Sequence, residues 1–393
     1  MVPRLASLLA PPGVRGQRVF VRADLNVPLR DGRVADASRI EASLPTLRKL
    51  LAAGARVIVA SHLGRPKGKR DPAFSLRPVA ARLANLLGRG VAFADDCVGP
   101  VAREAVAELR DGELLLLENL RFHAGEERND PAFARALVEL CDVYVNDAFG
   151  TAHRAHASTA GMVPLVKRAA AGELLWSELE HLGVVRDPKR PLLCLLGGAK
   201  VSDKLAVLEA LAPHADVLAV GGAMAYTFLR ALGQPTGGSL VEPERVDDAR
   251  RVLGAAQRAG RRVLLPSDHV IAREVRAGAE HRVSETIPDG WIAVDIGPRT
   301  ARAFAAEARA AGTIFWNGPM GVFEIDAFAK GTEAVARAVA DSDAVSVVGG
   351  GDSLAALNRL GVGRRITHRS TGGGASLEFV QGLTLPGVAA LDR

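Results

Sequence analysis

The chain has 393 residues, of which 48% are hydrophobic and 24% charged, a composition typical of globular proteins and not of disordered ones. Its 50 Lys and Arg residues only slightly outnumber its 44 Asp and Glu residues, and the charges are interspersed, which argues against a nucleic-acid-binding surface. The length suits two domains. The three cysteines are far apart and show no CxxC spacing, so we expect no disulfide framework or zinc site and a reducing, cytoplasmic environment.

No segment of the sequence predicts a signal peptide or a membrane span. The apolar run Leu5–Ala10 is interrupted by Pro11 and Pro12. The uncharged stretch Ala310–Phe323 contains Gly, Pro and Asn and is shorter than the roughly 18 apolar residues that a span needs. We therefore expect neither membrane nor nucleic-acid partners.

Strand-like and helix-like segments alternate from the start of the chain. A strand is predicted over Arg18–Asp24, a helix over Ser38–Gly54 and a second strand over Arg56–Ser61. Repetition of this kind predicts an α/β fold of doubly wound, Rossmann-like parallel sheets. Ligands of such sheets bind beyond the carboxyl ends of the strands, so the residues that follow each strand are the candidate site residues.

Basic residues follow the predicted strands of the first half. Arginine offers a planar fork of donors that matches carboxylate or phosphate oxygens. Any one arginine is more often part of a surface ion pair, but the repeated position at strand ends favours a site for a small polyanion. These residues are Arg22, Arg39, His62, Arg65, Arg121 and Arg154.

A metal site is the alternative interpretation of this half. The residues His62, Asp147, His153 and His156 offer metal-ligating side chains, and a metal-dependent hydrolase would use His153 and His156. No HExxH or comparable ligand spacing is present, so hydrogen bonding of these histidines to an anion is the favoured interpretation.

A helix predicted from Glu173 to about Asp187 separates this half from a second half whose strand ends are rich in glycine. The glycine-rich segments are "GGAKVSDK", "GGAMAYTF", "NGPMGVFE", "GGGDS" and "STGGGAS". None has the spacing of a Walker A loop or a GxGxxG motif, but five such turns together predict a nucleotide site.

Lys200 and Lys204 are two of only eight lysines, and the spacing predicts that they share one helix face beside a phosphoryl group. Asp352 follows three glycines and is expected to hold a nucleotide-bound Mg²⁺, and Glu324 is expected to accept a ribose hydroxyl. The glycine run Gly372–Gly374 precedes a predicted short helix and leaves room for an oxyanion.

Taken together, "RADLNVP", "SHLGRP", "ENLRF", "NDAFGTAHRAHAS", "GGAKVSDK", "WNGPMGVFE", "GGGDS" and "STGGGASLE" resemble, in this order, the motifs of the phosphoglycerate kinase family. The resemblance covers essentially the whole chain. It implies reversible phosphoryl transfer from 1,3-bisphosphoglycerate to ADP, giving 3-phosphoglycerate and ATP, by a monomeric, cytoplasmic glycolytic enzyme that uses Mg²⁺ as MgATP or MgADP. It also implies a triose-binding domain over residues 1–170 joined by the tail 379–393, a connecting helix over 171–186 and a nucleotide-binding domain over 187–378.

The resemblance assigns a role to individual residues. The residues implied to bind the triose are Asp24, Leu25, Asn26, Arg39, His62, Leu63, Gly64, Arg65, Arg121, His153 and Arg154. Those implied to bind the nucleotide are Lys204, Gly297, Glu324, Gly350, Gly351, Asp352 and Ser353, with Asp352 meeting Mg²⁺. Those implied to stabilise the phosphoryl group during transfer are Arg39, Lys200, Lys204, Gly372, Gly373 and Gly374.

Three residues depart from the family pattern: Ala223 and Tyr226, where Gly and Asn are usual, and Arg369, where an apolar residue is usual. A non-catalytic nucleotide-binding relative is a further alternative, and loss of Arg39, Lys204 or Asp352 would favour it. All three are present. In the ATP-consuming direction the nucleophile is a carboxylate that is already ionised, so the reaction needs positioning and charge neutralisation rather than a general base.

Overall fold

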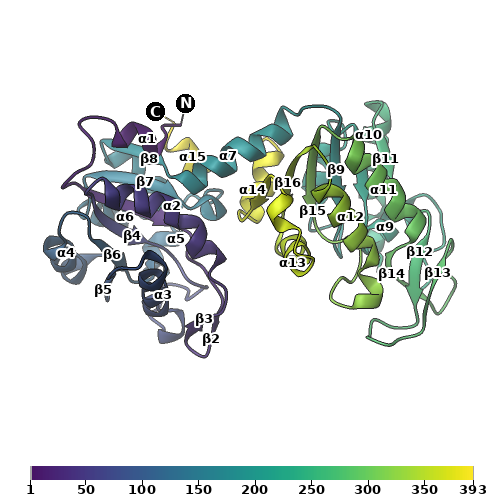
Figure 1. Cartoon of the computed structure of the whole chain (residues 1–393), viewed down its shortest axis with the longest axis horizontal. Helices are drawn as coiled ribbons and strands as arrows, with labels where there is room; N and C mark the ends of the chain where they lie inside the picture. Colours follow the sequence, from purple (N-terminus) through teal and green to yellow (C-terminus); the bar gives the residue numbers. More distant parts are fainter. Residues whose placement is uncertain (1, 393) are drawn as a thin grey trace. The chain divides into compact units, whose positions relative to one another are not determined.

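Two compact units make up the chain in a computed structural model that describes residues 2–392 (Figure 1). One contains residues up to Glu180 together with those from Thr384 onward, and the other contains His181–Leu383. Each is built on a six-stranded parallel sheet, which confirms the predicted α/β class. None of the helices within residues 2–392 is long and apolar enough to cross a membrane.

The bounds of these units differ from the predicted ones. The division falls inside α7 (Glu173–Arg186), so this helix belongs in part to each unit instead of forming a separate segment. The tail that joins the first unit starts at Thr384 rather than at Phe379. Phe379 lies in α14 (Gly374–Val380), and the guanidinium of Arg186 lies 5.3 Å from the centre of its ring, within the second unit.

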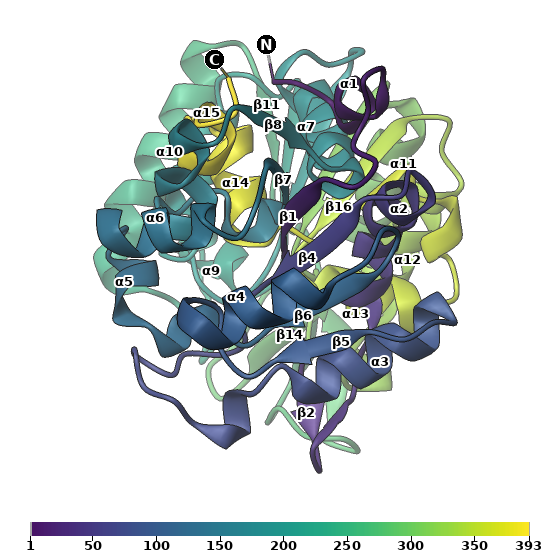
Figure 2. The ribbon, with the colours of Figure 1, turned by 90° about the vertical axis from the view of Figure 1, so that its left-hand side faces the viewer.

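In the first unit, the chain adds strands first on one side of β1 and then on the other. Across the sheet the strands are β5 (Ala92–Ala94), β6 (Leu114–Leu117), β4 (Arg56–Ala60), β1 (Arg18–Ala23), β7 (Val143–Asp147) and β8 (Arg168–Ala171). Figure 2 shows β6, β4 and β1 side by side. The chain starts in the middle of the sheet, builds one side and then returns to the other, so a switch point lies between β1 and β7.

The helices of the first unit bury alternate residues of these strands. Its helices are α1 (Leu5–Leu9), α2 (Ser38–Ala52), α3 (Arg77–Leu87), α4 (Gly99–Glu108), α5 (Ala124–Glu127), α6 (Pro131–Val138) and α15 (Pro386–Ala389), and a small hairpin is formed by β2 (Leu29–Arg30) and β3 (Arg33–Val34). Val19 and Val21 of β1 pack with apolar residues of α1, α2 and α3 in one core. Phe20 points to the opposite face, where it stacks on Tyr144 with ring centres 6.2 Å apart.

The second unit has the strand order of a dinucleotide-binding Rossmann sheet. Across the sheet the strands are β11 (Arg262–Leu264), β10 (Val217–Val220), β9 (Leu192–Leu196), β15 (Thr313–Asn317), β16 (Val345–Gly349) and β17 (His368–Ser370). A three-stranded antiparallel sheet contains β13 (His281–Ser284), β12 (His269–Ala272) and β14 (Ile292–Ile296). The switch point of the large sheet lies between β9 and β15.

Helix α11 shows how the second unit forms its core. The helices are α8 (Leu205–Leu211), α9 (Met224–Ala231), α10 (Val246–Arg258), α11 (Pro298–Ala310), α12 (Lys330–Ala340), α13 (Gly351–Arg359) and α14. Ala301, Phe304 and Ala308 of α11 recur every three or four residues and pack with Leu195 and Trp316 of the sheet. Loops follow the carboxyl end of each parallel strand, and these loops carry the candidate site residues.

The N-terminus of α7 is held by the buried carboxyl group of Asp147. Asp147 ends β7, and its Oδ1 accepts hydrogen bonds from the backbone N–H groups of Leu174 (2.9 Å) and Leu175 (3.3 Å). The N–H of Glu173 donates to Thr46 Oγ1 at 2.8 Å. Burial raises the pKa of Asp147 to about 7 from its ordinary 3.8, against the effect of these hydrogen bonds.

We predict that Asp147 makes the folded chain less stable as the pH rises from about 4 to about 7. The folded state keeps the proton over this range while the unfolded state has lost it, so the contribution is complete below pH 4 and is lost as the pH passes 7. The loss is on the order of 4 kcal/mol at most. Asp147→Asn keeps the acceptor and removes the titration. Urea denaturation at pH 5 to 8 should show the variant gaining stability relative to the parent protein with rising pH, and a constant difference would contradict the assignment.

Candidate active site

The loop after β1 places a carboxylate and an arginine together. Asp24 follows β1 directly and is buried, and its Oδ2 accepts a hydrogen bond from Arg39 Nη1 at 2.6 Å. Its Oδ1 is buried and has no hydrogen-bond partner among the described residues. The neighbouring loop is fixed by Ser61, whose Oγ accepts from the N–H of Leu25 at 2.8 Å. An acceptor that is buried and unused in the protein suits a donor from a ligand.

Buried Arg22 organises the same strand ends. Its Nε donates to Ser158 Oγ at 2.9 Å, and its Nη2 lies 3.2 Å from His62 Nδ1. The hydroxyl of Ser158 donates in turn to Glu126 Oε1 at 2.6 Å. Glu126 is fully buried, and burial raises its pKa. The network fixes the ring of His62 at the carboxyl end of β4.

The loop after β4 is held by the loop after β6. Asn26 Oδ1 accepts from the N–H of Gly64 at 2.9 Å, and Arg121 Nη1 donates to the carbonyl of Gly64 at 2.9 Å. Asn119 Nδ2 donates to the carbonyl of buried Leu63 at 2.7 Å. Arg121 Nε lies 3.3 Å from Glu127 Oε1 but without the geometry of a hydrogen bond.

Arg65, Arg154 and His153 complete the predicted set in this unit. Arg65 is exposed and has no ion pair or hydrogen bond through its side chain within residues 2–392. Arg154 Nε donates to His153 Nε2 at 3.3 Å. Both residues are half-buried in the segment after β7.

Two histidines of this cluster, His62 and His156, have pKa values lowered by burial and by neighbouring arginines. Burial, together with the charges of Arg22, Arg121 and Arg39, holds the pKa of His62 well below its usual 6.5. Burial and the charges of Arg121 and Arg22 likewise lower the pKa of His156 to about 3. The positive charge here exceeds what the nearby carboxylates neutralise, which is the condition for attracting an anion.

The predicted metal-ligating residues do not form a cluster in the described part of the chain. The group that the structure brings within metal-binding reach there is Asp96, Cys97 and His123, none of which was predicted. Its side chains have a local role, because His123 Nε2 lies 2.7 Å from Asp96 Oδ1 and ties two loops together. The three cysteines are free and buried, in agreement with the prediction of no disulfide framework.

In the second unit, Lys204 lies at the switch point of the sheet. Its Nζ donates to the carbonyls of Gly197 (2.5 Å) and Asn317 (2.7 Å), which end or follow the adjacent strands β9 and β15. Burial lowers the pKa of Lys204 to about 8 from 10.5, although Asp352 and Asp203 oppose this shift. An ammonium has three donors, so one remains for a ligand.

The prediction that Lys200 and Lys204 share a helix face is wrong. Helix α8 begins at Leu205, and both lysines lie in the loop before it. Gly198 opens this loop with a φ of 123°, a conformation that side chains rarely adopt, and the two hydrogen bonds of Lys204 tie the loop to the sheet. Lys200 is exposed at the surface of the same loop.

The loop after β15 admits only glycine at Gly318. A Cβ there would overlap the carbonyl oxygen of Gly197 and the ammonium of Lys204. The N–H of Gly318 donates to Ser353 Oγ at 2.6 Å, which brings the loops after β15 and β16 together. Ser353 is buried in the first turn of α13, whereas its neighbours Gly351 and Asp352 are exposed.

Two further predicted nucleotide residues occupy different surroundings. Gly297 is buried before α11, and a Cβ on it would overlap the side chain of Asp268. Asp268 accepts from the N–H groups of Arg299 and Thr300 and so caps α11. Glu324 is exposed in the loop after β15.

The predicted oxyanion glycines stand at the start of a short helix: Gly372 and Gly373 precede it, and Gly374 is its first residue. Helix α14 begins at Gly374, and Gly373 has a φ of 55°. The N–H of Gly372 donates weakly to Ser370 Oγ at 3.3 Å, and Ser370 Oγ lies 2.6 Å from Ser376 Oγ.

The departures Tyr226 and Arg369 have ordinary structural roles. Tyr226 is buried with Leu229, Ile271 and Trp291 in a small apolar cluster. Arg369 Nη1 donates to Asn358 Oδ1 at 3.2 Å on the surface of the second unit.

All the residues predicted to bind the triose belong to the first unit, and all those predicted to bind the nucleotide belong to the second. Several positioning residues were missed by the sequence reasoning, namely Ser61, Asn119, Glu126, Ser158 and Asn317. Ser61, Asn119 and Asn317 stand at strand ends, which was an available signal. Glu126 and Ser158 were not recognisable, because they act through contacts far apart in sequence.

Known proteins match the chain over nearly its whole length. The family model described as phosphoglycerate kinase matches residues 10–383. The phosphoglycerate kinase of Solibacter usitatus is 56% identical over 386 residues, covering 97% of both chains, and that of Moorella thermoacetica is 56% identical over 383 residues, with 97% of both chains covered. The solved structure of phosphoglycerate kinase from Coxiella burnetii is similar with a TM-score of 0.91 and 41% identity, covering 100% of this chain and 99% of that one. That of the enzyme from Pyrococcus horikoshii OT3 has a TM-score of 0.85 and 34% identity, covering 99% and 98%.

Proposed function

The chain belongs to the phosphoglycerate kinase family, and we propose that its two units divide the substrates of that reaction between them. The chain is a phosphotransferase of glycolysis by this membership, and a metal-dependent hydrolase is not favoured. The first unit binds 3-phosphoglycerate or 1,3-bisphosphoglycerate, and the second binds ADP or ATP. This division is carried by the contrast between the two candidate sites. In the first unit several arginines surround His62, whereas in the second unit one lysine, Lys204, lies among glycines.

In the first unit, the unused Oδ1 of Asp24 accepts the hydroxyl of the glycerate. Arg39 and Arg65 neutralise the acid groups of the triose, since Arg65 has no partner of its own in the described chain. Neutral His62 donates a hydrogen bond and leaves the charge to the guanidinium groups. The carboxylate that attacks ATP is ionised at pH 7, so none of these residues needs to act as a base.

In the second unit, the remaining donor of Lys204 stabilises the charge that develops on the phosphoryl group. Glycines at the starts of α13 and α14 leave backbone N–H groups accessible to phosphate oxygens, and Gly318 keeps a side chain out of the space beside Lys204. Arg39 and Lys200 add positive charge from their respective units.

Mg²⁺ enters as part of the nucleotide substrate, with Asp352 as its protein ligand. The side chain of Asp352 is exposed in the first turn of α13 and has no ion pair or hydrogen bond in the described chain, so a hard carboxylate oxygen is available. The ion supplies charge neutralisation at the phosphates. In a coupled assay with 3-phosphoglycerate and MgATP, EDTA is expected to abolish turnover and excess Mg²⁺ to restore it. Turnover that persists in EDTA would exclude this role.

We predict that Lys204→Ala lowers turnover by about 10²–10³-fold, the scale of losing one preorganised charge stabiliser. Nucleotide affinity should fall less, because most contacts of the nucleotide remain. Steady-state kinetics and calorimetry with MgADP measure the two effects. A variant with full turnover would refute the role of Lys204.

Arg65→Ala is the matched control in the other unit. It removes an exposed positive charge, and we expect it to weaken 3-phosphoglycerate binding without changing MgADP binding. Calorimetry with each ligand separately decides this. An equal loss for both ligands would contradict the division of substrates between the units.

We further propose that a monomeric, cytoplasmic enzyme brings its two units together for each turnover, with α7 and its ends as the hinge. The reacting atoms must approach to about 3–3.5 Å, and each substrate is bound by one unit only. Small-angle scattering should give a smaller radius of gyration for the protein with 3-phosphoglycerate and a non-hydrolysable MgATP analogue than for the free protein or either binary complex. An unchanged radius in the ternary complex would argue against closure.

A further inference from the structure

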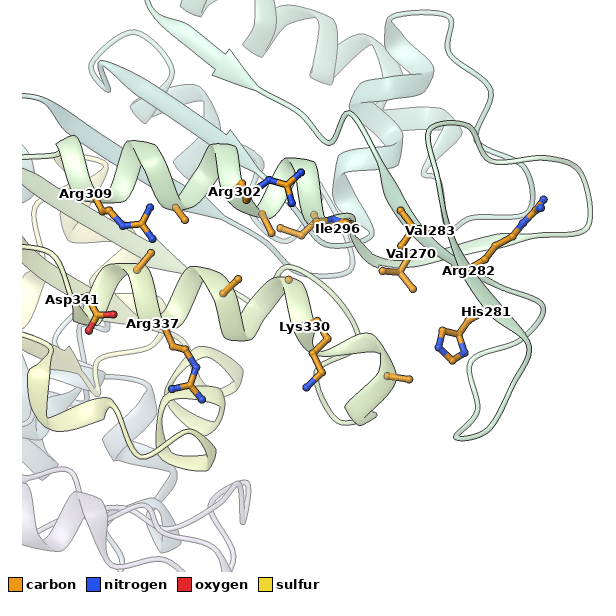
Figure 3. A pocket seen from close by; sticks show the side chains of 17 residues that line it. Val270, His281, Arg282, Val283, Ile296, Arg302, Arg309, Lys330, Arg337 and Asp341 are labelled. Atoms are coloured by element: carbon orange, nitrogen blue, oxygen red, sulfur yellow. The ribbon is translucent and has the colours of Figure 1, made fainter.

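The second unit contains a groove that the kinase reaction does not use. It has a volume of about 860 Å³ and lies between α11 and α12, with one end against β12 and β13 (Figure 3). None of its lining residues belongs to the residues proposed above for catalysis, the nucleotide or the triose. The volume lies within the range of pockets that hold small organic ligands.

The floor of the groove is apolar. Ala301 and Ala305 of α11 and Ala338 of α12 are buried along it, so small apolar side chains form the surface where the two helices meet. At the end near the small sheet the lining includes Val270 and Val283, and Val283 is 55% exposed. This floor offers an apolar body a surface from which water is readily displaced.

The edges of the groove carry three arginines without acidic partners, whereas Lys330 of the same lining pairs with Glu333 at 3.0 Å. Arg302 and Arg309 of α11 are seven residues apart, which places them about 10.5 Å apart along the helix on one face, and Arg337 of α12 lies on the other edge (Figure 3). All three are exposed, and none forms an ion pair or hydrogen bond through its guanidinium within residues 2–392. Asp341 is the acidic residue of the lining, and it pairs with Arg365.

Two exposed arginines of this unit that lie outside the groove have acidic partners. Arg262 pairs with Glu307 of α11 at 2.5 Å, on a side of this helix that does not line the groove, and Arg251 pairs with Asp248 and Glu209. Exposed arginines without an acidic partner also occur elsewhere in this unit, at Arg230, Arg258 and Arg364. Arg302, Arg309 and Arg337 differ from these in lining one groove together. Their charge is uncompensated where an apolar surface is also exposed.

We propose that this groove is a binding site for an amphipathic organic anion, a small molecule with an apolar ring or chain and a sulfonate, carboxylate or phosphate group. The apolar part lies on the alanines and valines of the floor. The acid group takes charge-assisted hydrogen bonds from Arg302, Arg309 and Arg337, which present guanidinium forks on both edges. The site is separate from that of the nucleotide and does not depend on the proposed roles of Lys204 or Asp352.

The probe for this site is 8-anilinonaphthalene-1-sulfonate, whose fluorescence rises in apolar surroundings. We expect one bound probe per chain, unchanged by saturating MgADP, and at least tenfold weaker binding in the double variant Arg302→Ala, Arg337→Ala. N-phenyl-1-naphthylamine, which has the same rings without the sulfonate, should also bind at least tenfold more weakly. Sodium sulfate alone should compete poorly, because it lacks the apolar part.

The matched control is the double variant Arg251→Ala, Arg262→Ala, which makes the same change in net charge at ion-paired sites outside the groove. It should bind the probe within about twofold of the parent protein. Thermal melting and kinase turnover of both double variants should match the parent, which shows that they are folded. Displacement of the probe by MgADP, equal loss in the two double variants, or equal binding of the uncharged analogue would each overturn the proposal.

Discussion

The ammonium of Lys204, held between two strand-end carbonyls, is the interaction on which the second unit's site depends. A parallel sheet that is built outward in both directions leaves a gap at its switch point, where the loops after β9 and β15 diverge. Lys204 connects these two loops, because its ammonium donates hydrogen bonds to the carbonyls of Gly197 and Asn317. The loops around it need glycine because the same space must admit both the ammonium and a ligand. At Gly318, for example, the space cannot hold even the Cβ of an alanine.

In the first unit, a buried arginine connects the loops at the strand ends. Arg22 lies within β1 and reaches Ser158 and His62, so that the loops after β4 and β7 are joined through one guanidinium. Removing a guanidinium from water is costly, and Glu126 and the hydroxyl of Ser158 compensate part of that cost. The remaining charge is directed to the candidate triose site.

Much of this architecture was accessible from the sequence because it is local. The strand predicted over Arg18–Asp24 follows from its β-branched run, and the helix predicted from Glu173 follows from the stop signal at Asp187 and Pro188. Both end within a residue or two of the observed ends. The helical placement of Lys200 and Lys204 failed because spacing alone cannot show that a side chain bonds to a strand 113 residues away. The partners of Arg22 were inaccessible for the same reason, since Ser158 is 136 residues distant.

The candidate sites of the two units differ in how their positive charge depends on pH. Burial lowers the pKa of Arg121, yet guanidinium groups stay protonated at every physiological pH, so the electrostatic attraction exerted by the first unit is constant. The second unit relies on an amine whose pKa burial has lowered to about 8. Alkaline conditions above pH 8 therefore remove the charge of Lys204, whereas the guanidinium groups of the first unit keep theirs.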